Sequence, residues 1–261
     1  MKKKRNSKSM ILLLCALFGF LLFGMFFSSC DKNSTKEENT ASENTEVVEE
    51  EVVGEKPIVV LDAAFGGELT GYVGIVNEAD LNAEVVEAIK TRLEEDNRFT
   101  TVLTHEKNTS ASVLDKAAFI NETNPALFIT ICAENSNNPD ASGMHVYADK
   151  PDSETAEESL RLAKCIQEKF NTEEKPVDVR YRYFQSIGNN TYQIKNVDVE
   201  DKEPKNMATW LILEETNTVG VVVQQMYVTS QSDIDTYKTP EGLSNIAEAY
   251  YEIICEYLGL K

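Results

Sequence analysis

The stretch LDAAFGG, residues 61–67, follows an apolar run and combines a carboxylate with two glycines. A buried strand that ends in Asp62 and then turns through Gly66 and Gly67 is typical of a site at the carboxyl edge of a sheet. Such a turn usually delivers a side chain that binds a cation or moves a proton. The middle of this turn instead holds two alanines and Phe65, which can do neither. The stretch therefore predicts the frame of a site without its reactive side chain.

The cysteines and histidines offer little further chemistry. Of five cysteines, two belong to the N-terminal segment, and the other three, Cys132, Cys165 and Cys255, are widely spaced with no CxxC pair. This pattern indicates neither a disulfide framework nor a zinc knuckle. The two histidines, His105 and His145, are isolated from each other, and each is interpreted as an ordinary residue at or in a strand. A nucleophilic Cys132 would need a nearby base, and only His105 could serve.

Apolar runs alternate with amphipathic stretches along residues 57–261. Strands are predicted at 57–63, 99–104, 126–133, 143–149, 209–215 and 219–228. Helices are predicted at 77–97, from residue 110 or 112 to about 121, at 153–170 and from 240 to about 259. The segment 171–208 is polar and irregular, with two short strand-like pieces. This alternation predicts an α/β fold with a mostly parallel central sheet flanked by helices.

The first 30 residues have the features of an export signal. Five positive charges precede seventeen uncharged residues at 11–27, and the segment ends in the sequence FSSC. That ending resembles the bacterial lipobox, in which the cysteine, here Cys30, is lipidated and becomes the mature N-terminus. An uncleaved N-terminal anchor is the alternative, because the apolar run is only slightly short for a spanning helix. Either interpretation holds the rest of the chain on the outer face of the bacterial cytoplasmic membrane.

Residues 31–56 are predicted to be a disordered acidic tether. They contain nine acids, three lysines and no aromatic residue, so they cannot bury enough apolar surface to offset the entropy of ordering. The remaining residues, 57–261, form one domain. Of the formal net charge of −19, the first 30 residues supply +5 and the tether −6, which leaves −18 on the domain. A domain this acidic is not expected to bind nucleic acid.

Several short blocks of the domain occur in a recognisable order. They are DAAFGG at 62–67, EADLNA at 78–83, LTH at 103–105, FITICAE at 128–134, ILE at 212–214 and VVVQQMYVTS at 221–230. In order, spacing and local sequence these blocks resemble the zinc-dependent N-acetylmuramoyl-L-alanine amidases of bacterial cell walls (the Amidase_3 type). The resemblance covers essentially all of residues 57–261 and implies the fold of that family, in a degenerate member.

The resemblance also implies where a zinc site would lie. In the family, zinc is bound by a histidine in the first block, a glutamate before the first helix and a histidine in the third strand. A glutamate on a late strand acts as general base on the zinc-bound water, which attacks the amide between muramic acid and L-alanine. Carried over position by position, these residues are Phe65, Glu78, Cys132 and Gln224 in this sequence.

These replacements remove the chemistry that the family needs. Phe65 has no lone pair, Cys132 is a zinc ligand only as a thiolate, and the neutral amide of Gln224 cannot accept a proton at ordinary pH. Two protein ligands without a base do not make a hydrolytic zinc centre. We therefore expect no catalytic residue, no bound metal and no cofactor, the family's zinc being lost.

Other candidate cleft residues follow from the same comparison. The carboxylate of Asp62 is expected to brace the turn by hydrogen bonds. Glu78 sits in the first turn of a helix, where the helix dipole alone would favour a carboxylate. His105 and Glu214 occupy positions where the family has arginine, and Glu214 would reverse the charge at the cleft edge. Together with Gln224, these residues would line the surviving cleft.

The sequence thus predicts a pseudoenzyme: a lipoprotein with an inactive amidase-like domain. Its expected partners are the membrane, through a lipid on Cys30, and either peptidoglycan or a cell-wall protein. Residues alone do not choose between these two binding partners. The alternative is an active zinc N-acetylmuramoyl-L-alanine amidase, a peptidoglycan hydrolase with a rebuilt metal site.

Overall fold

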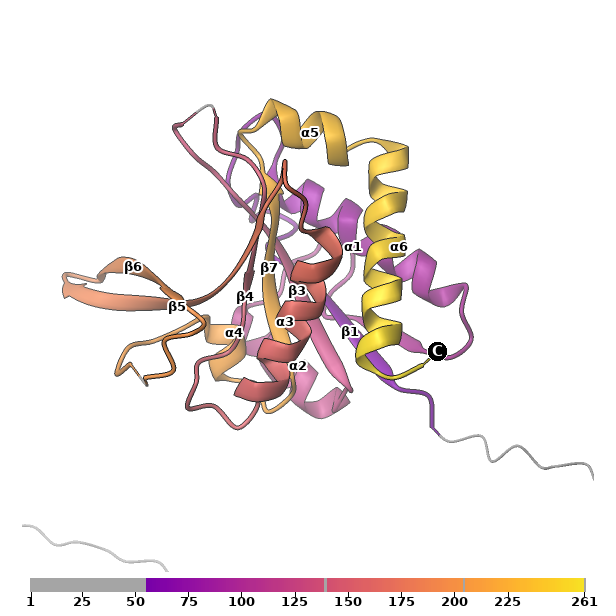
Figure 1. Cartoon of the computed structure of the whole chain (residues 1–261), viewed down its shortest axis with the longest axis horizontal. Helices are drawn as coiled ribbons and strands as arrows, with labels where there is room; N and C mark the ends of the chain where they lie inside the picture. Colours follow the sequence, from indigo (N-terminus) through magenta and orange to yellow (C-terminus); the bar gives the residue numbers. More distant parts are fainter. Residues whose placement is uncertain (1–54, 139, 204, 261) are drawn as a thin grey trace, which may run out of the picture. The chain divides into compact units, whose positions relative to one another are not determined.

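A computed structural model describes residues 55–138, 140–203 and 205–260 of the chain. The predicted export signal and all but the last two residues of the predicted tether lie outside these ranges. The described chain forms one seven-stranded sheet with the strand order β2-β1-β3-β7-β4-β5-β6, covered by helices on both faces (Figure 1). The predicted α/β class with a central sheet flanked by helices is confirmed.

The strands are mainly those that the apolar runs predict. Their bounds are Ile58–Ala63 (β1), Thr100–Leu103 (β2), Leu127–Glu134 (β3), Met144–Tyr147 (β4), Val177–Gly188 (β5), Thr191–Asp198 (β6) and Gly220–Tyr227 (β7). Strands β2, β1, β3 and β7 run parallel, β4 is antiparallel to β7 and parallel to β5, and β6 is antiparallel to β5. The carboxyl ends of β1, β3 and β7 therefore meet at one edge of the sheet.

Six helices accompany these strands in the described ranges. Their bounds are Glu78–Glu94 (α1), Val113–Thr123 (α2), Ala156–Phe170 (α3), Leu211–Glu214 (α4), Gln231–Tyr237 (α5) and Pro240–Tyr257 (α6). The hydroxyl of Ser112 accepts a hydrogen bond from the backbone N–H of Asp115, so α2 begins at one of the two predicted caps. The hydroxyl of Thr239 caps α6 in the same way, with proline as the first helical residue.

Successive residues of the parallel strands point to opposite faces of the sheet, and this alternation divides the core in two. Val59, Leu61, Ile129 and Ile131 belong to the larger core, which also receives buried side chains from α1, α3 and α6. The smaller core lies on the opposite face, where α2 and α4 contribute the buried residues that pack on Val60, Phe128, Cys132, Tyr147 and Val222.

The structure corrects two predictions of secondary structure. The predicted strand at 209–215 is wrong, because residues 211–214 form the one-turn helix α4. A short apolar run has no periodicity that separates a buried helical turn from a strand. The segment 171–208, predicted to be irregular with two short strand-like pieces, is more regular than expected. Those pieces belong to the long antiparallel pair β5 and β6, which projects from the body of the domain in Figure 1.

Helix α5 was not predicted at all, because its seven residues include only Ile234 and Tyr237 as partly buried hydrophobics, too few to show an apolar stripe. Among the described residues, the structure contains no helix that combines the length and the apolar character needed to cross a bilayer.

We predict that Gly220→Ala will destabilise the domain by about 1–3 kcal/mol, because overpacking forces neighbouring atoms to move. A Cβ at this position would lie 2.1 Å from a ring carbon of Phe128. The free energy of unfolding, from denaturant titration, measures the effect. In a Phe128→Leu background, where the ring is gone, the same substitution should cost clearly less. An equal cost in both backgrounds would contradict this explanation.

Candidate functional site

The four positions that the resemblance singled out converge at the carboxyl edge of the parallel strands. Phe65 follows β1, Cys132 lies near the end of β3, and Gln224 is its partner across the β3–β7 ladder. Glu78 begins α1 and accepts a hydrogen bond from the backbone N–H of Ala133, the residue after Cys132. The fold thus assembles the frame of a single site from three strands and one helix.

Asp62 anchors the turn that opens this site. Its carboxylate is buried, and Oδ1 accepts a hydrogen bond of 2.5 Å from the hydroxyl of Thr104. The same oxygen lies 2.9 Å from the ammonium of Lys116, which reaches it from α2 and is also buried. Removing one partner of such a pair leaves an uncompensated buried charge. Asp62 therefore fixes the end of β1 to its neighbours.

The backbone of the turn is held as firmly as its carboxylate. The carbonyl oxygen of Ala63 accepts a hydrogen bond from Lys116 Nζ at 2.8 Å. The carbonyl oxygen of Ala64 accepts one from the buried Asn82 side chain at 2.8 Å, and its N–H donates to Ile131 in β3. The turn keeps one defined conformation although its middle residues are chemically inert.

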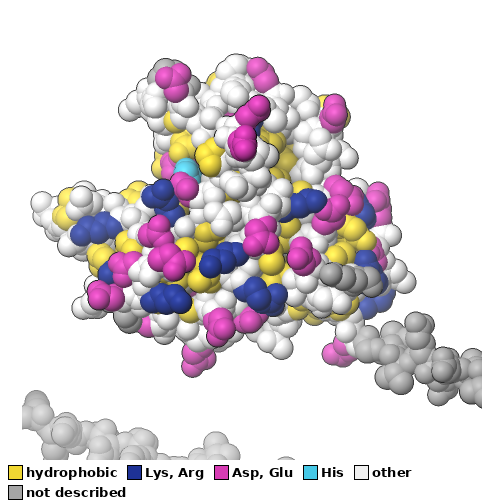
Figure 2. Space-filling model, viewed as in Figure 1, with side chains coloured by type: hydrophobic (Ala, Val, Ile, Leu, Met, Phe, Trp, Pro, Cys, Tyr) yellow, Lys and Arg dark blue, Asp and Glu magenta, His cyan; other side chains and the backbone are white. Residues whose placement is uncertain are grey.

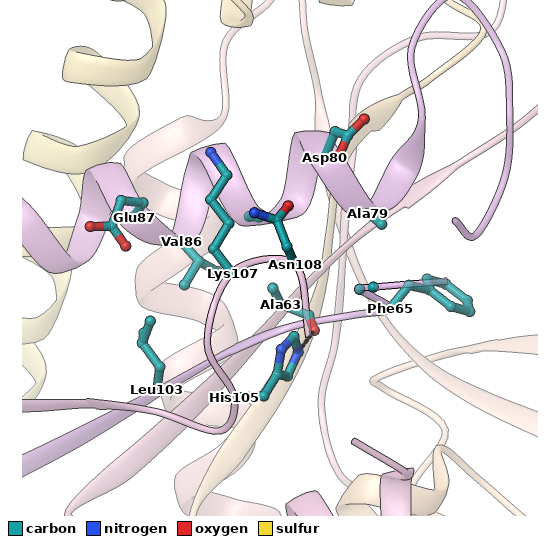
Figure 3. A pocket seen from close by; sticks show the side chains of 13 residues that line it. Ala63, Phe65, Ala79, Asp80, Val86, Glu87, Leu103, His105, Lys107 and Asn108 are labelled. Carbon is teal, nitrogen blue, oxygen red and sulfur yellow. Dashed lines mark hydrogen bonds between the residues drawn. The ribbon is translucent and has the colours of Figure 1, made fainter. Parts of the chain in front are cut away.

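His105 belongs to the bracing of this turn. Its Nε2 lies 2.9 Å from the carbonyl oxygen of Ala63, a contact drawn in Figure 3, and its Nδ1 lies 3.1 Å from the carbonyl oxygen of Glu106. Both ring nitrogens therefore face backbone oxygens. His105 lines a small cavity of about 40 Å³ beside α1, together with Phe65 and Lys107. Its contacts explain its presence without a metal and without a thiol partner.

Phe65 holds the first ligand position with a strained and exposed conformation. Its φ is +65°, a left-handed value that is uncommon for a residue other than glycine, and 42% of its surface is exposed. A Cβ built on Gly71 would lie within 2.8 Å of the Phe65 ring and 2.6 Å of a Glu78 oxygen. The aromatic ring therefore lies beside the Glu78 carboxylate, where it offers no lone pair.

Glu78 is buried, with 1% of its surface exposed, and both of its oxygens are occupied. Oε1 accepts from the N–H of Ala133 and Oε2 from the N–H of Tyr72, each at 2.9 Å. Burial raises the pKa of this carboxyl above its ordinary value, although the two N–H donors oppose the shift. Glu78 thus fastens the 66–76 loop to β3, a role beyond the helix-dipole effect expected for its position.

Cys132 is buried in the smaller core rather than presented to solvent. Burial raises its pKa well above the ordinary thiol value, and the negative charge of Glu78 adds to this effect. Burial therefore favours the protonated thiol over the thiolate, which is the form that binds zinc or acts as a nucleophile.

The side chain of Gln224 is hydrogen-bonded at both its amide nitrogen and its carbonyl oxygen. Its amide Nε2 donates to Oε2 of Glu134 at 2.7 Å, and its carbonyl Oε1 accepts from the hydroxyl of Tyr147 at 2.8 Å. That hydroxyl in turn accepts from Arg182 Nη2, which also lies 3.3 Å from the Gln224 carbonyl. An amide has one donating end and one accepting end, and both are satisfied here. A carboxylate at this position would face Glu134 without a donor between them.

Arg182 supplies the positive charge of this cluster. Only 6% of its surface is exposed, and its Nη2 lies 3.6 Å from the Glu134 carboxylate. Its Nε donates to the Asn196 side chain at 2.9 Å. The guanidinium carbon also lies 4.2 Å from the centre of the Tyr147 ring, close enough for a cation–π interaction.

The remaining sequence candidates lie apart from this centre or at its rim. His145 is a residue of β4, and its Nε2 lies 3.1 Å from the hydroxyl of Tyr227. Burial lowers the pKa of His145. Glu214, expected at the cleft edge, ends α4 before the start of β7 and pairs with Lys150 at 3.5 Å. Because β7 runs from there toward Gln224, Glu214 lies at the opposite end of the strand.

These residues do not fit a zinc ion. Within the described residues, no three histidine, cysteine, aspartate or glutamate side chains are grouped so that they could hold a metal. Phe65 lacks a donor atom, both Glu78 oxygens are engaged by backbone N–H groups, and Cys132 is a buried thiol. A zinc ion bound here would compete with the backbone N–H groups of Tyr72 and Ala133 for the Glu78 oxygens. Beyond Glu78, only Cys132, as a thiolate, could serve as a ligand.

Sequence reasoning missed Arg182, Glu134 and Tyr147. Tyr147 and Arg182 lie in β4 and β5, where alternating polar and apolar residues indicate a strand but not which residues it faces. The detectable signal was the pair Arg180 and Arg182 two residues apart, which places both cations on one face of a strand.

The domain is an α/β sandwich whose candidate site lies at the carboxyl edge of its parallel strands. A family model described as N-acetylmuramoyl-L-alanine amidase (Amidase_3) matches residues 59–256. The chain therefore belongs to the N-acetylmuramoyl-L-alanine amidase family.

Individual relatives are distant. A Buchnera aphidicola protein, described provisionally as an N-acetylmuramoyl-L-alanine amidase, is 23% identical over 230 residues, which are 79% of this chain and 94% of that protein. The catalytic domain of CwlV from Bacillus (Paenibacillus) polymyxa has a TM-score of 0.60 at 18% identity, covering 78% of this chain and 99% of its own. An amidase from Clostridium difficile 630 has a TM-score of 0.62 at 16% identity, with 80% and 100% covered. The structures agree in fold.

We predict that Glu78→Gln will destabilise the domain by about 1–3 kcal/mol, because one backbone donor then faces an amide NH₂ group. The amide hydrogens of Tyr72 and Ala133 should exchange faster with solvent, as measured by hydrogen exchange.

Asp80→Asn is the matched control, since Asp80 is an exposed carboxylate in the same helical turn. Loss of its helix-dipole contribution should cost less than about 1 kcal/mol. Equal effects of the two substitutions would show that the dipole explains Glu78 and the backbone contacts do not.

Proposed function

We propose that this chain is a lipid-anchored lipoprotein on the outer face of the bacterial cytoplasmic membrane, with an amidase-like domain that does not hydrolyse peptidoglycan. The domain binds peptidoglycan or a cell-wall protein instead. Lipidation is assigned to Cys30, because the FSSC sequence follows a basic segment and an uncharged apolar run.

The hydrogen bonds of Gln224 are the main support for the proposed lack of activity. The general-base position holds an amide whose two ends are bound to Glu134 and Tyr147. Hydrolysis by this family's route needs a carboxylate that accepts a proton from a metal-bound water. An amide that is neutral and fully hydrogen-bonded supplies no such acceptor, and Phe65 supplies no metal ligand.

An exposed apolar loop supports a binding role. Five large hydrophobic side chains in one stretch are exposed: Phe65, Leu69, Tyr72, Val73 and Ile75. The loop backbone is fixed by Glu78 and by hydrogen bonds to Val228 and within the loop. A rigid apolar surface loses little conformational entropy on binding. One structural neighbour, the CwlD amidase of Clostridioides difficile, is described in complex with the GerS lipoprotein (TM-score 0.60, 18% identity), which supports protein binding by this fold.

Charge affects which surfaces the domain can approach. Its net charge of −18 opposes contact with anionic surfaces unless specific contacts compensate. On the face shown in Figure 2, acidic side chains are interspersed with lysine and arginine rather than gathered in one patch. The arrangement favours recognition through the apolar loop over recognition through bulk charge.

An active amidase with a rebuilt site is the alternative, and Glu134 is the observation that favours it. Its carboxylate lies next to the base position, 2.7 Å from Gln224 Nε2. However, the same carboxylate faces Arg182 and accepts from the Gln224 amide and from the N–H of Asn135. These contacts engage both carboxylate oxygens, Oε1 with Asn135 and Oε2 with Gln224 and Arg182, so neither oxygen is left without a partner.

The proposal predicts that the purified full chain will contain well under one equivalent of zinc and will not clear suspensions of purified cell walls. Metal analysis and turbidity measure the two properties on the same preparation. An active amidase of the family serves as the control for wall quality. One equivalent of zinc together with clearing would establish the hydrolase alternative.

The proposal also predicts retention on insoluble sacculi or on a wall-protein fraction, above that of an acidic control protein. Tyr72→Ser with Val73→Ser should lower retention, because both side chains lie on the apolar loop. Leu114→Ser, which changes an equally exposed apolar residue on α2, should leave it unchanged. Equal retention of both variants would exclude the loop as the binding surface.

A further inference from the structure

We infer that Arg182 excludes divalent cations from this cleft, because its buried guanidinium holds the position of the positive charge that a metal would supply. The inference rests on the proposed loss of the zinc centre. The inference adds that histidines restored at residues 65 and 132 would not be enough to restore metal binding.

The guanidinium is fixed in place from several directions. It contacts side chains from β3, β7, β4 and β6, which are Glu134, Gln224, Tyr147 and Asn196. The ring of Trp210 also lies 5.3 Å from its central carbon. A side chain held by this many partners cannot swing out to solvent without leaving several buried polar groups unpaired.

This fixed charge lies beside the metal positions of the family. Arg182 Nη2 is 3.3 Å from the carbonyl oxygen of Gln224, and Gln224 is the cross-strand partner of Cys132. Glu134, whose carboxylate lies 3.6 Å from Arg182 Nη2, follows Cys132 by two residues on β3. Arg182 thus faces the cleft from the β5 side while Glu78 faces it from α1.

Two consequences disfavour a metal here. A divalent ion would be repelled by this fixed positive charge, in a site that water screens poorly. In addition, Arg182 already neutralises Glu134, the carboxylate nearest to the Gln224 position. A carboxylate restored at residue 224 would pair with Arg182 rather than remain available to a metal-bound water.

Zinc titration of the full chain, purified in detergent, tests the inference. The starting variant carries Phe65→His and Cys132→His, which restore two nitrogen ligands beside Glu78. Arg182→Met, Arg182→Lys or Arg180→Met is then added. Zinc affinity is measured by competition with a chromophoric chelator, and folding is checked by denaturant unfolding.

Arg180→Met is the matched control. Arg180 lies two residues away on the same strand and carries the same charge, but its side chain is 41% exposed and pairs with Asp178. Arg182→Lys keeps a positive charge while losing the planar fork. It therefore separates the effect of charge from the effect of packing.

We expect Arg182→Met to tighten zinc binding by on the order of 100-fold relative to the two-histidine variant. Arg180→Met should change it by less than about 3-fold, because water screens an exposed charge, and Arg182→Lys should leave zinc binding weak. If Arg182→Met does not fold, adding Glu134→Gln removes the unpaired carboxylate, and the same tightening is expected.

Equal zinc affinity with and without Arg182 would overturn the inference and leave the proposed function standing. Tight binding by the Arg182→Lys variant would also overturn it, because it would show that packing and not charge is decisive. Stoichiometric zinc in the unaltered chain would overturn the proposed function itself.

Discussion

One buried guanidinium joins most of the sheet in this domain. Arg182 lies in β5 and contacts side chains from β3, β7, β4 and β6, so five of the seven strands meet at a single positive charge. A buried charge is stable only where its partners are complete. Its partners here are the Tyr147 hydroxyl, the Gln224 amide oxygen and the Glu134 carboxylate. The same contacts therefore hold the register of β7, β4, β5 and β6 and the orientation of the Gln224 side chain.

The polar residues around the site hold the backbone of the turn and of the loop that follows it. Asp62 and Lys116 form a buried ion pair at the end of β1, and Glu78 accepts two backbone N–H groups. None of these roles needs a metal. Their loss would leave buried polar groups unpaired, at a cost comparable to a sizeable part of a domain's stability. Phe65 has no polar side-chain atom and is 42% exposed, so its exchange would leave no buried polar group unpaired.

The sequence predicted much of the fold and only part of the site. Continuous apolar strands and amphipathic helices gave the α/β class, and ordered blocks gave the positions that converge at the sheet edge. The run at 209–215 was predicted to be a strand, because a helix of four residues with two buried side chains is too short to show a helical period. Arg182 could not be foreseen as the centre of the cluster. Its role depends on the pairing of β3 and β4 with β7 and of β5 with β6, which brings together residues up to 90 positions apart.

The projecting strand β6 has a consequence for how this protein behaves at high concentration. Within the described sheet it is the last strand, so one row of its backbone N–H and C=O groups has no sheet partner. Tyr192 and Ile194 are exposed on it, and an apolar open edge is a template for pairing with another chain. Lys195 and Asp198 place charges along the same strand and act as gatekeepers against this pairing. The charges on β6 therefore oppose edge-to-edge association of the domain.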